Sequence, residues 1–116
     1  MIMDIPTDAL LLRIFVGEAA RHRHRPLYEA IVLRAREMHL AGATVIRCVL
    51  GYGKSSRLHT SKILRLSDDL PLVIEIVDSE EKINAFMPEL EKLMPAGLVT
   101  LEKVRAHFYR GVPPPA

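Results

Sequence analysis

The order in which strand-like and helix-like periodicities follow one another is the feature that most constrains the fold. Four stretches have the alternation or the β-branched, apolar composition of strands: residues 8–17, 43–50, 72–78 and 98–109. Two stretches carry apolar residues at helical spacing: residues 26–41 and 79–96. In the first strand, every second residue from Leu10 to Val16 is apolar, which places these residues on one face. The chain therefore predicts the order β-α-β-β-α-β.

This order is that of the split βαβ arrangement. It predicts an α+β, ferredoxin-like fold, with a four-stranded antiparallel sheet and both helices on one face of it. A chain of 116 residues has the length of one domain. We expect a single domain over residues 1–116, with its core at about 8–109. Residues 110–116 are rich in proline and predict a flexible tail.

Alternation also predicts which side chains lie on each face of the sheet. The face away from the helices takes six apolar residues: Leu11, Phe15, Val45, Val49, Val73 and Val77. An apolar sheet face of that extent marks an interface, so we expect it to be buried by oligomerisation. On the same face, Arg47 is expected to pair with Glu75 of the neighbouring strand. In the last strand, Val104, Ala106 and Phe108 are expected to face inward.

Further signals mark the ends of the helices. Gly42 is expected to end the first helix and Gly97 the second. Asp78 and Glu81, three residues apart, match the capping-box pattern at the start of the second helix. Residues 18–25, which include the basic run RHRHR, break the strand pattern and predict a loop. For the two histidines of this run, a metal site is the alternative to a solvated basic loop.

Composition excludes several classes of protein. The net charge of +2 arises from 16 basic and 14 acidic residues, so the surface as a whole is not the strongly basic surface of a nucleic-acid-binding protein. With three Tyr, three Phe and no Trp, the chain has few aromatic rings on which bases could stack. The single cysteine, Cys48, excludes an intramolecular disulfide framework and a multi-cysteine zinc site. No apolar run approaches the roughly 18 residues of a membrane helix, and no basic segment of a signal peptide is present. We expect a cytoplasmic protein that binds no nucleic acid.

The stretch GYGKSSRLHTSK, at residues 51–62, is the richest in candidate binding groups. Its Gly53, Lys54 and Ser55 match the end of a P-loop. A P-loop needs glycine where Cys48 stands, and a helix that begins at the lysine, so that interpretation fails. In a weaker phosphate-binding interpretation, the glycines turn backbone N–H groups toward an anion that the polar side chains also contact. A solvated, flexible loop is the alternative.

Five motifs occur in a specific order: PLYEAIV (26–32), AGATV (41–45), glycine-aromatic-glycine (51–53), LRLSDDLP (64–71) and GLVTLEKV (97–104). In this combination, the chain resembles the domain-of-unknown-function 190 family over roughly residues 10–107. That family is related in structure to the PII-like signal-transduction proteins. Departures from the usual family pattern are Cys48 in place of glycine, the basic segment before the first helix, and Lys54 in place of a small residue.

The resemblance implies a PII-like domain that assembles as a homotrimer. It also implies an adenine nucleotide (ATP, ADP or AMP) as effector, bound in the clefts between subunits, with no certain cofactor. The long connection at residues 51–70 would report the ligand to a protein partner, with a membrane transporter or channel as one candidate. Gly97 would approach the phosphates, although a helix C-cap explains this glycine by itself. The expected ligand-binding residues are Gly51, Gly53, Lys54, Ser55, Ser56, His59, Gly97, Lys103 and Arg105.

Catalytic and metal-binding residues are not expected. The chain offers no nucleophile accompanied by a base and an orienting third group. We therefore predict a non-catalytic regulatory protein that senses a small molecule and signals through the long connection between the second and third strands. A slow nucleotide-hydrolysing enzyme that uses the same inter-subunit cleft is the alternative.

Overall fold

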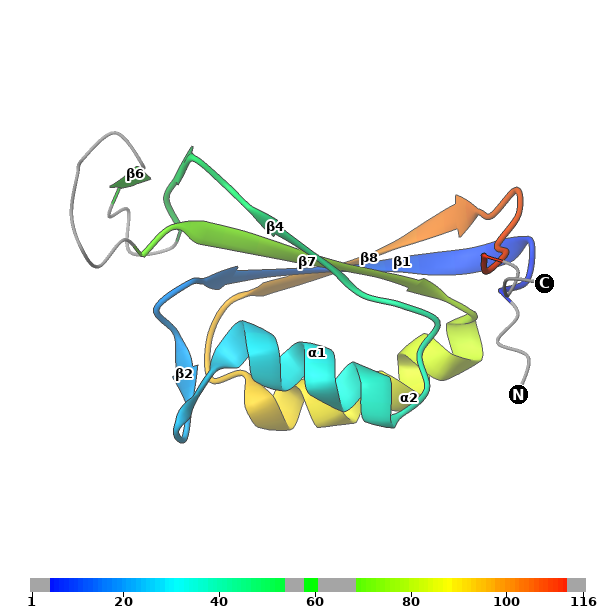
Figure 1. Cartoon of the computed structure of the whole chain (residues 1–116), viewed down its shortest axis with the longest axis horizontal. Helices are drawn as coiled ribbons and strands as arrows, with labels where there is room; N and C mark the ends of the chain where they lie inside the picture. Colours follow the sequence, from blue (N-terminus) through cyan, green and yellow to red (C-terminus); the bar gives the residue numbers. More distant parts are fainter. Residues whose placement is uncertain (1–4, 54–57, 61–68, 113–116) are drawn as a thin grey trace.

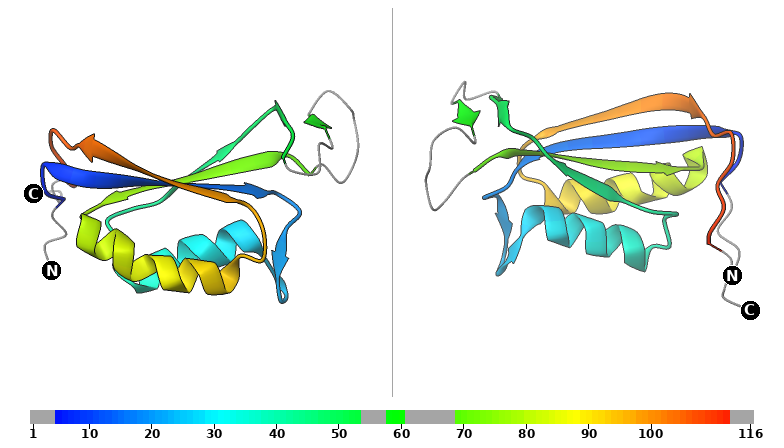
Figure 2. Two further views of the ribbon diagram at one scale, coloured as in Figure 1. Left: turned by 180° about the vertical axis from the view of Figure 1, so that it is seen from behind. Right: turned by 45° about the horizontal axis from the view of Figure 1, so that its top comes forward.

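A two-layer sandwich is the architecture in the computed structural model, which describes residues 5–53, 58–60 and 69–112 (Figure 1). The sheet contains β1 (Asp8–Gly17), β4 (Thr44–Arg47), β7 (Pro71–Asp78) and β8 (Leu98–Arg105), and the helices are α1 (Leu27–Glu37) and α2 (Glu80–Leu93). The strands are antiparallel in the order β4-β7-β1-β8. Both helices cover the same face of the sheet, as the view from behind also shows (Figure 2). The predicted α+β, ferredoxin-like fold is confirmed.

The core lies between the helices and the inner face of the two central strands. On this face β1 and β7 place buried side chains opposite one another, such as Leu12 opposite Ile76 and Ile14 opposite Ile74. The helices add the remaining large core residues: Leu27, Ile31, Ile83, Phe86 and Leu90. Each such side chain contributes about 1.5–3 kcal/mol when it leaves water. Most of the stability therefore comes from these rows of alternating residues.

The helix ends differ from the expected ones. Helix α1 ends at Glu37, well before Gly42: His39 has a φ of 61°, and the Leu40 N–H donates to the Ala35 carbonyl. At the start of α2, Ser79 is the N-cap, and its side chain accepts a hydrogen bond from the backbone N–H of Lys82. The expected capping box, with Asp78 as the cap, is therefore wrong.

Asp78 has another role, because its carboxylate is fully buried. One oxygen accepts from the backbone N–H of Ala41 at 2.8 Å, and the other from that of Ser79 at 2.7 Å. A buried carboxylate is tolerated only where such bonds replace its hydration. Asp78 therefore ties the α1–β4 connection to the end of β7 and to the start of α2.

We predict that Asp78→Ala lowers the free energy of unfolding by at least about 1–3 kcal/mol, because two backbone donors lose their shared acceptor. Urea unfolding monitored by circular dichroism measures the change. Asp8→Ala, at an exposed position at the start of β1, is the matched control and is expected to change little. Equal stability of the two variants would contradict this role for Asp78.

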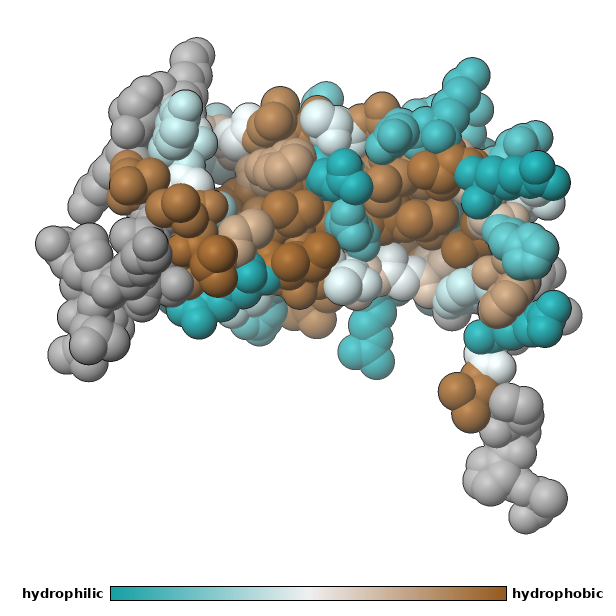
Figure 3. All heavy atoms as spheres, turned by 90° about the horizontal axis from the view of Figure 1, so that it is seen from above, coloured by the Kyte–Doolittle hydropathy of each residue, from teal (hydrophilic) through white to brown (hydrophobic). Residues whose placement is uncertain are grey.

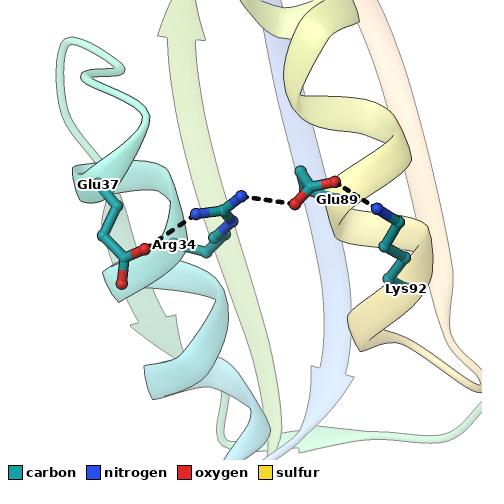
Figure 4. A network of polar contacts seen from close by, with 4 residues as sticks. All are labelled: Arg34, Glu37, Glu89 and Lys92. Carbon is teal, nitrogen blue, oxygen red and sulfur yellow. Dashed lines mark hydrogen bonds and ion pairs between the residues drawn. The ribbon is translucent and has the colours of Figure 1, made fainter.

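A row of charged side chains joins the two helices on the side away from the sheet (Figure 4). Arg34 Nη2 donates to Glu89 Oε1 at 2.6 Å, and Arg34 Nη1 donates to Glu37 Oε2 at 2.9 Å. Lys92 Nζ donates to the second oxygen of Glu89 at 2.9 Å. The hydrogen bonds from Lys92 and then from Arg34 hold the pKa of Glu89 below its ordinary value. The bonds to Glu89 and Glu37 raise the pKa of Arg34.

The lowered pKa of Glu89 makes this row sensitive to acid. The stability it adds is present above the ordinary carboxyl pKa of 4.5 and is lost as the pH falls through the lower pKa of the folded state. We predict that Glu89→Gln lowers the urea midpoint near neutral pH, and that the difference from the wild type disappears under more acidic conditions. Glu91→Gln, at an exposed position of the same helix, is the control. A difference that grows toward acid would contradict the assignment.

The register of β4 corrects the expected outer face. Val45 lies opposite Ile74 and so on the helix side, whereas Ile46 lies opposite Val73 on the outer face. Val49 lies beyond the end of β4 and is 71% exposed. Arg47 forms an ion pair with Glu18 at 3.0 Å instead of pairing with Glu75. The partner of Glu75 is Arg13 on β1.

The chain ends and short hairpins also depart from expectation. Residues 21–26 form a hairpin of β2 (Arg21–His22) and β3 (Arg25–Pro26), where a loop was predicted.

Strand β8 ends at Arg105, so the inward positions expected for Val104, Ala106 and Phe108 are wrong. Val104 pairs with Ala9 on the outer face, Ala106 lies beyond the strand, and Phe108 is 64% exposed. The Ala106 N–H donates to the Thr7 carbonyl, which joins the two ends of the described chain. Within the described ranges, no helix is both long and apolar enough to cross a membrane.

Candidate functional site

One end of the sheet, here called the loop end, gathers the C-terminus of β1 and the first residues of β7 and β8. Gly17 pairs with Pro71, and Phe15 pairs with Leu98, so the three strands meet there. The connection from β4 to β7 leaves the sheet at this end (Figure 1). Its described part contains β5 (Leu50–Gly51) and β6 (His59–Thr60), which form a short antiparallel ladder. The long connection therefore begins and returns beside the β1–β7 pair.

Gly51 and Gly97 are required by close approaches at this end. A Cβ atom on Gly51 would lie 2.9 Å from Cγ of Pro71. At Gly97 the φ angle is 130°, and an added Cβ would lie 2.8 Å from the carbonyl oxygen of Phe15. Backbone of that φ is rarely adopted by residues with a side chain. The α2–β8 turn therefore packs its backbone directly against β1.

Acidic side chains position the chain segments at the loop end. The Ala19 N–H donates to Asp69 Oδ1 at 2.8 Å, and the Glu18 N–H donates to the Leu70 carbonyl at 2.8 Å. Glu18 also accepts from Nη2 of Arg47 at 3.0 Å, beside an Nε contact of the same length. The ends of β1 and β4 and the entry into β7 are therefore held by one set of polar contacts. Glu18 was not singled out from the sequence, since its partner lies 29 positions away.

The described part of the connection exposes apolar side chains. Leu50 is 55% exposed, Tyr52 70% and Leu58 60%. The segment is conspicuous in sequence for its basic and hydroxyl groups, and this apolar surface was not predicted from it. Strands of two residues are too short for an alternating pattern to show which of their side chains are exposed. The connection thus offers a non-polar contact surface close to the sheet.

The structure groups only some of the predicted ligand-binding residues. Gly51, Gly53, the backbone of His59 and Gly97 lie at the loop end. Lys54, Ser55 and Ser56 lie outside the described residues.

Lys103 and Arg105 lie toward the far end of β8, opposite Leu10 and Asp8. From Gly97 to Lys103 the strand spans roughly 20 Å at the usual rise per residue. Within one chain, these two cations therefore lie toward the end of the sheet opposite to Gly97.

The described part of the chain has a hollow near each end of the sheet. One, of about 280 Å³, lies at the end of α2 and is mainly apolar, with Met87, Met94 and Val99 among its lining residues. The other, of about 290 Å³, lies at the opposite end, near Glu80 and Lys103. Ligand pockets usually measure about 300–1,000 Å³, so neither hollow is large for a nucleotide. Among the described His, Cys, Asp and Glu side chains, no three gather as metal ligands.

We predict that Gly97→Ala lowers the free energy of unfolding by about 1–3 kcal/mol, because alanine is strained at this φ and its Cβ meets the Phe15 carbonyl. Gly42→Ala is the matched control, since an added Cβ there has no neighbour within 4 Å. Thermal unfolding of both variants provides the comparison. A Gly97→Ala protein as stable as the Gly42→Ala protein would contradict the packing described for this turn.

The β-α-β-β-α-β sandwich, with its long connection at one end, is the fold of the PII-like proteins. A putative PII-like signaling protein from Thermus thermophilus superimposes with a TM-score of 0.62, at 18% identity, over 90% of this chain and 93% of that one. CPII, a nitrogen regulatory PII-like protein from Thiomonas intermedia, gives a TM-score of 0.59 at 17% identity, over 85% and 88% of the two chains. That structure contains ADP, AMP and bicarbonate.

The chain belongs to the DUF190 family, described as "Uncharacterized ACR", whose model matches residues 9–106. A UPF0166 protein of Aquifex aeolicus is 45% identical over 98 residues, which are 84% of this chain and 92% of the relative. The UPF0166 protein of Methanocaldococcus jannaschii is 34% identical over 104 residues, or 89% and 94% of the two chains. The protein is thus a member of DUF190 with a PII-like fold, as its sequence motifs predict.

Proposed function

We propose that this protein is a non-catalytic, homotrimeric sensor of an adenine nucleotide. The observation that carries the proposal is the loop end, where the Gly97 turn and the two ends of the β4–β7 connection meet at β1 and β7. A ligand held there contacts the turn and the connection at the same time. The PII-like CPII protein, whose fold this chain shares, was determined with ADP, AMP and bicarbonate.

The binding cleft lies between subunits. Single-chain hollows of about 280 and 290 Å³ are small for a nucleotide. Lys103 and Arg105, remote from Gly97 in their own subunit, reach the ligand from a neighbouring one. The outer sheet face supports this assembly, because Ile46 and Leu98 on it are 44% and 56% exposed and apolar. Lys54, Ser55, Ser56 and His59 complete the anion site in this proposal.

Ligand binding changes the preferred conformation of residues 51–70, and a protein partner distinguishes the two states. The partner contacts the apolar surface of Leu50, Tyr52 and Leu58. Such a surface favours an apolar patch on the partner.

We predict that ATP, ADP or AMP binds at millimolar concentration or below, as measured by calorimetric titration. Lys54→Ala is expected to weaken binding, since it removes a charge opposite the phosphates. Lys92→Ala, whose lysine lies exposed on α2, is the matched control and keeps the wild-type affinity. Bicarbonate is titrated alone and together with each nucleotide.

Absence of binding by all three nucleotides, with and without bicarbonate, would overturn the nucleotide assignment. The protein is also incubated with nucleotide and magnesium. Recovery of intact nucleotide supports sensing and counts against hydrolysis. Phosphate release that Lys54→Ala abolishes would instead favour the enzymatic alternative.

A further inference from the structure

The outer face of the sheet carries a polar row across all four strands, beside a row that is entirely apolar. The register aligns four residues, one from each strand: Thr44, Glu75, Arg13 and Thr100. A neighbouring row contains only apolar residues: Ile46, Val73, Phe15 and Leu98. On the other side lie Val77 and Leu11, and the exposed Glu102 of the edge strand β8 is opposite Leu11. The view onto this face shows a small hydrophilic area within a largely hydrophobic surface (Figure 3).

An ion pair forms the middle of this row. Nε and Nη2 of Arg13 each lie 2.9 Å from Oε2 of Glu75, and the two side chains are 35% and 30% exposed. A guanidinium has five N–H donors, and a carboxylate has about four acceptor sites. The contacts within the sheet use only one edge of the guanidinium and one carboxylate oxygen. The remaining N–H donors of Arg13 and the second carboxylate oxygen of Glu75 are therefore available to a molecule that covers the face.

The chemistry of the pair selects among possible occupants of the face. A buried ion pair is favourable only if its remaining donors and acceptors find partners. An apolar partner surface leaves them unsatisfied, and a partner of one charge sign satisfies only one member. A second copy of this chain brings the same apolar rows together with both a carboxylate and a guanidinium. These two rows are therefore complementary to the same rows of a second copy, in hydropathy and in charge.

We propose that the outer faces of neighbouring copies pack together and that Arg13 of one copy bonds to Glu75 of the next. The inference rests on the self-association that is part of the proposed function. It adds that the contact between Arg13 and Glu75 makes a second copy the preferred partner and fixes how the two sheet faces align. Around a closed assembly, these bonds join the ion pairs into a ring of alternating charge. Buried polar contacts of this kind set register and partner choice in other assemblies.

Charge reversal combined with mixing tests the inference. Arg13→Glu gives an acidic centre and Glu75→Arg a basic one, so each variant alone is expected to dissociate, as measured by sedimentation velocity. A mixture of the two is expected to recover the mass of the wild-type assembly, because opposite charges then meet between copies. Arg36→Glu, at an exposed position on α1, makes the same charge change away from the face and is expected to keep the wild-type mass.

Two results would overturn the inference: wild-type mass for both single variants, or folded variants that do not recover the assembly on mixing. Circular dichroism establishes that each variant is folded. If a reversal variant fails to fold, Glu75→Gln replaces it, since an amide still accepts from Arg13 within the sheet. That variant is expected to weaken self-association at least about tenfold, and an unchanged dissociation constant would count against the inference.

These outcomes are separable from failure of the proposed function. A wild-type protein that is monomeric would overturn the trimer and this inference together. A wild-type assembly without the mixing effect overturns only the Arg13–Glu75 contact, and nucleotide binding is then measured independently. Co-assembly that needs a different protein on the outer face would show that the occupant is not a second copy.

Discussion

The whole structure depends on the register in which β1 pairs with β7. In this register the inner rows of both strands are fully apolar down to Asp78, and they meet the buried faces of the two helices. A shift by one residue would exchange the two faces of β1. Arg13 would then enter the core, and Leu12 and Ile14 would face outward. The same register thus decides which side chains enter the core and which form the polar row on the outer face. It also brings the strand ends at the loop end side by side.

Strands β1 and β7 could be predicted because their apolar residues alternate without interruption. The TVIRCVL stretch has no such alternation, since its polar residues Thr44 and Arg47 fall on opposite faces and leave the facing of Val45 and Ile46 undecided. Only pairing with β7 decides which of the two faces the helices. The start of α2 was ambiguous for a similar reason. Asp78 and Ser79 are both good caps, and the distant Ala41 N–H, which binds the Asp78 carboxylate, leaves the cap position to Ser79.

At the loop end, a glycine that the backbone conformation requires could be recognised from the sequence. Side chains whose hydrogen-bond partners lie far away in the sequence could not. Gly97 was expected to end the second helix, but α2 ends at Leu93 with Met94 as its C-cap; Gly97 lies three residues further on, in the turn into β8, where its φ of 130° requires glycine. The bond from the Ala19 N–H to Asp69 spans 50 positions, and no local pattern encodes it. The ion pair of Glu18 and Arg47 is equally non-local. Such contacts depend on the strand order, which must be known before they can be placed.

The hydrogen bond between Ala106 and Thr7 has a practical consequence for how the protein can be handled. It brings the two ends of the described chain together at the end of the sheet where β1 begins and β8 stops, opposite the loop end (Figure 1). A fluorophore or affinity handle attached next to Thr7 or Ala106 therefore lies far from the place where the β4–β7 connection leaves the sheet. Surface immobilisation through such a handle would leave the loop end facing solution.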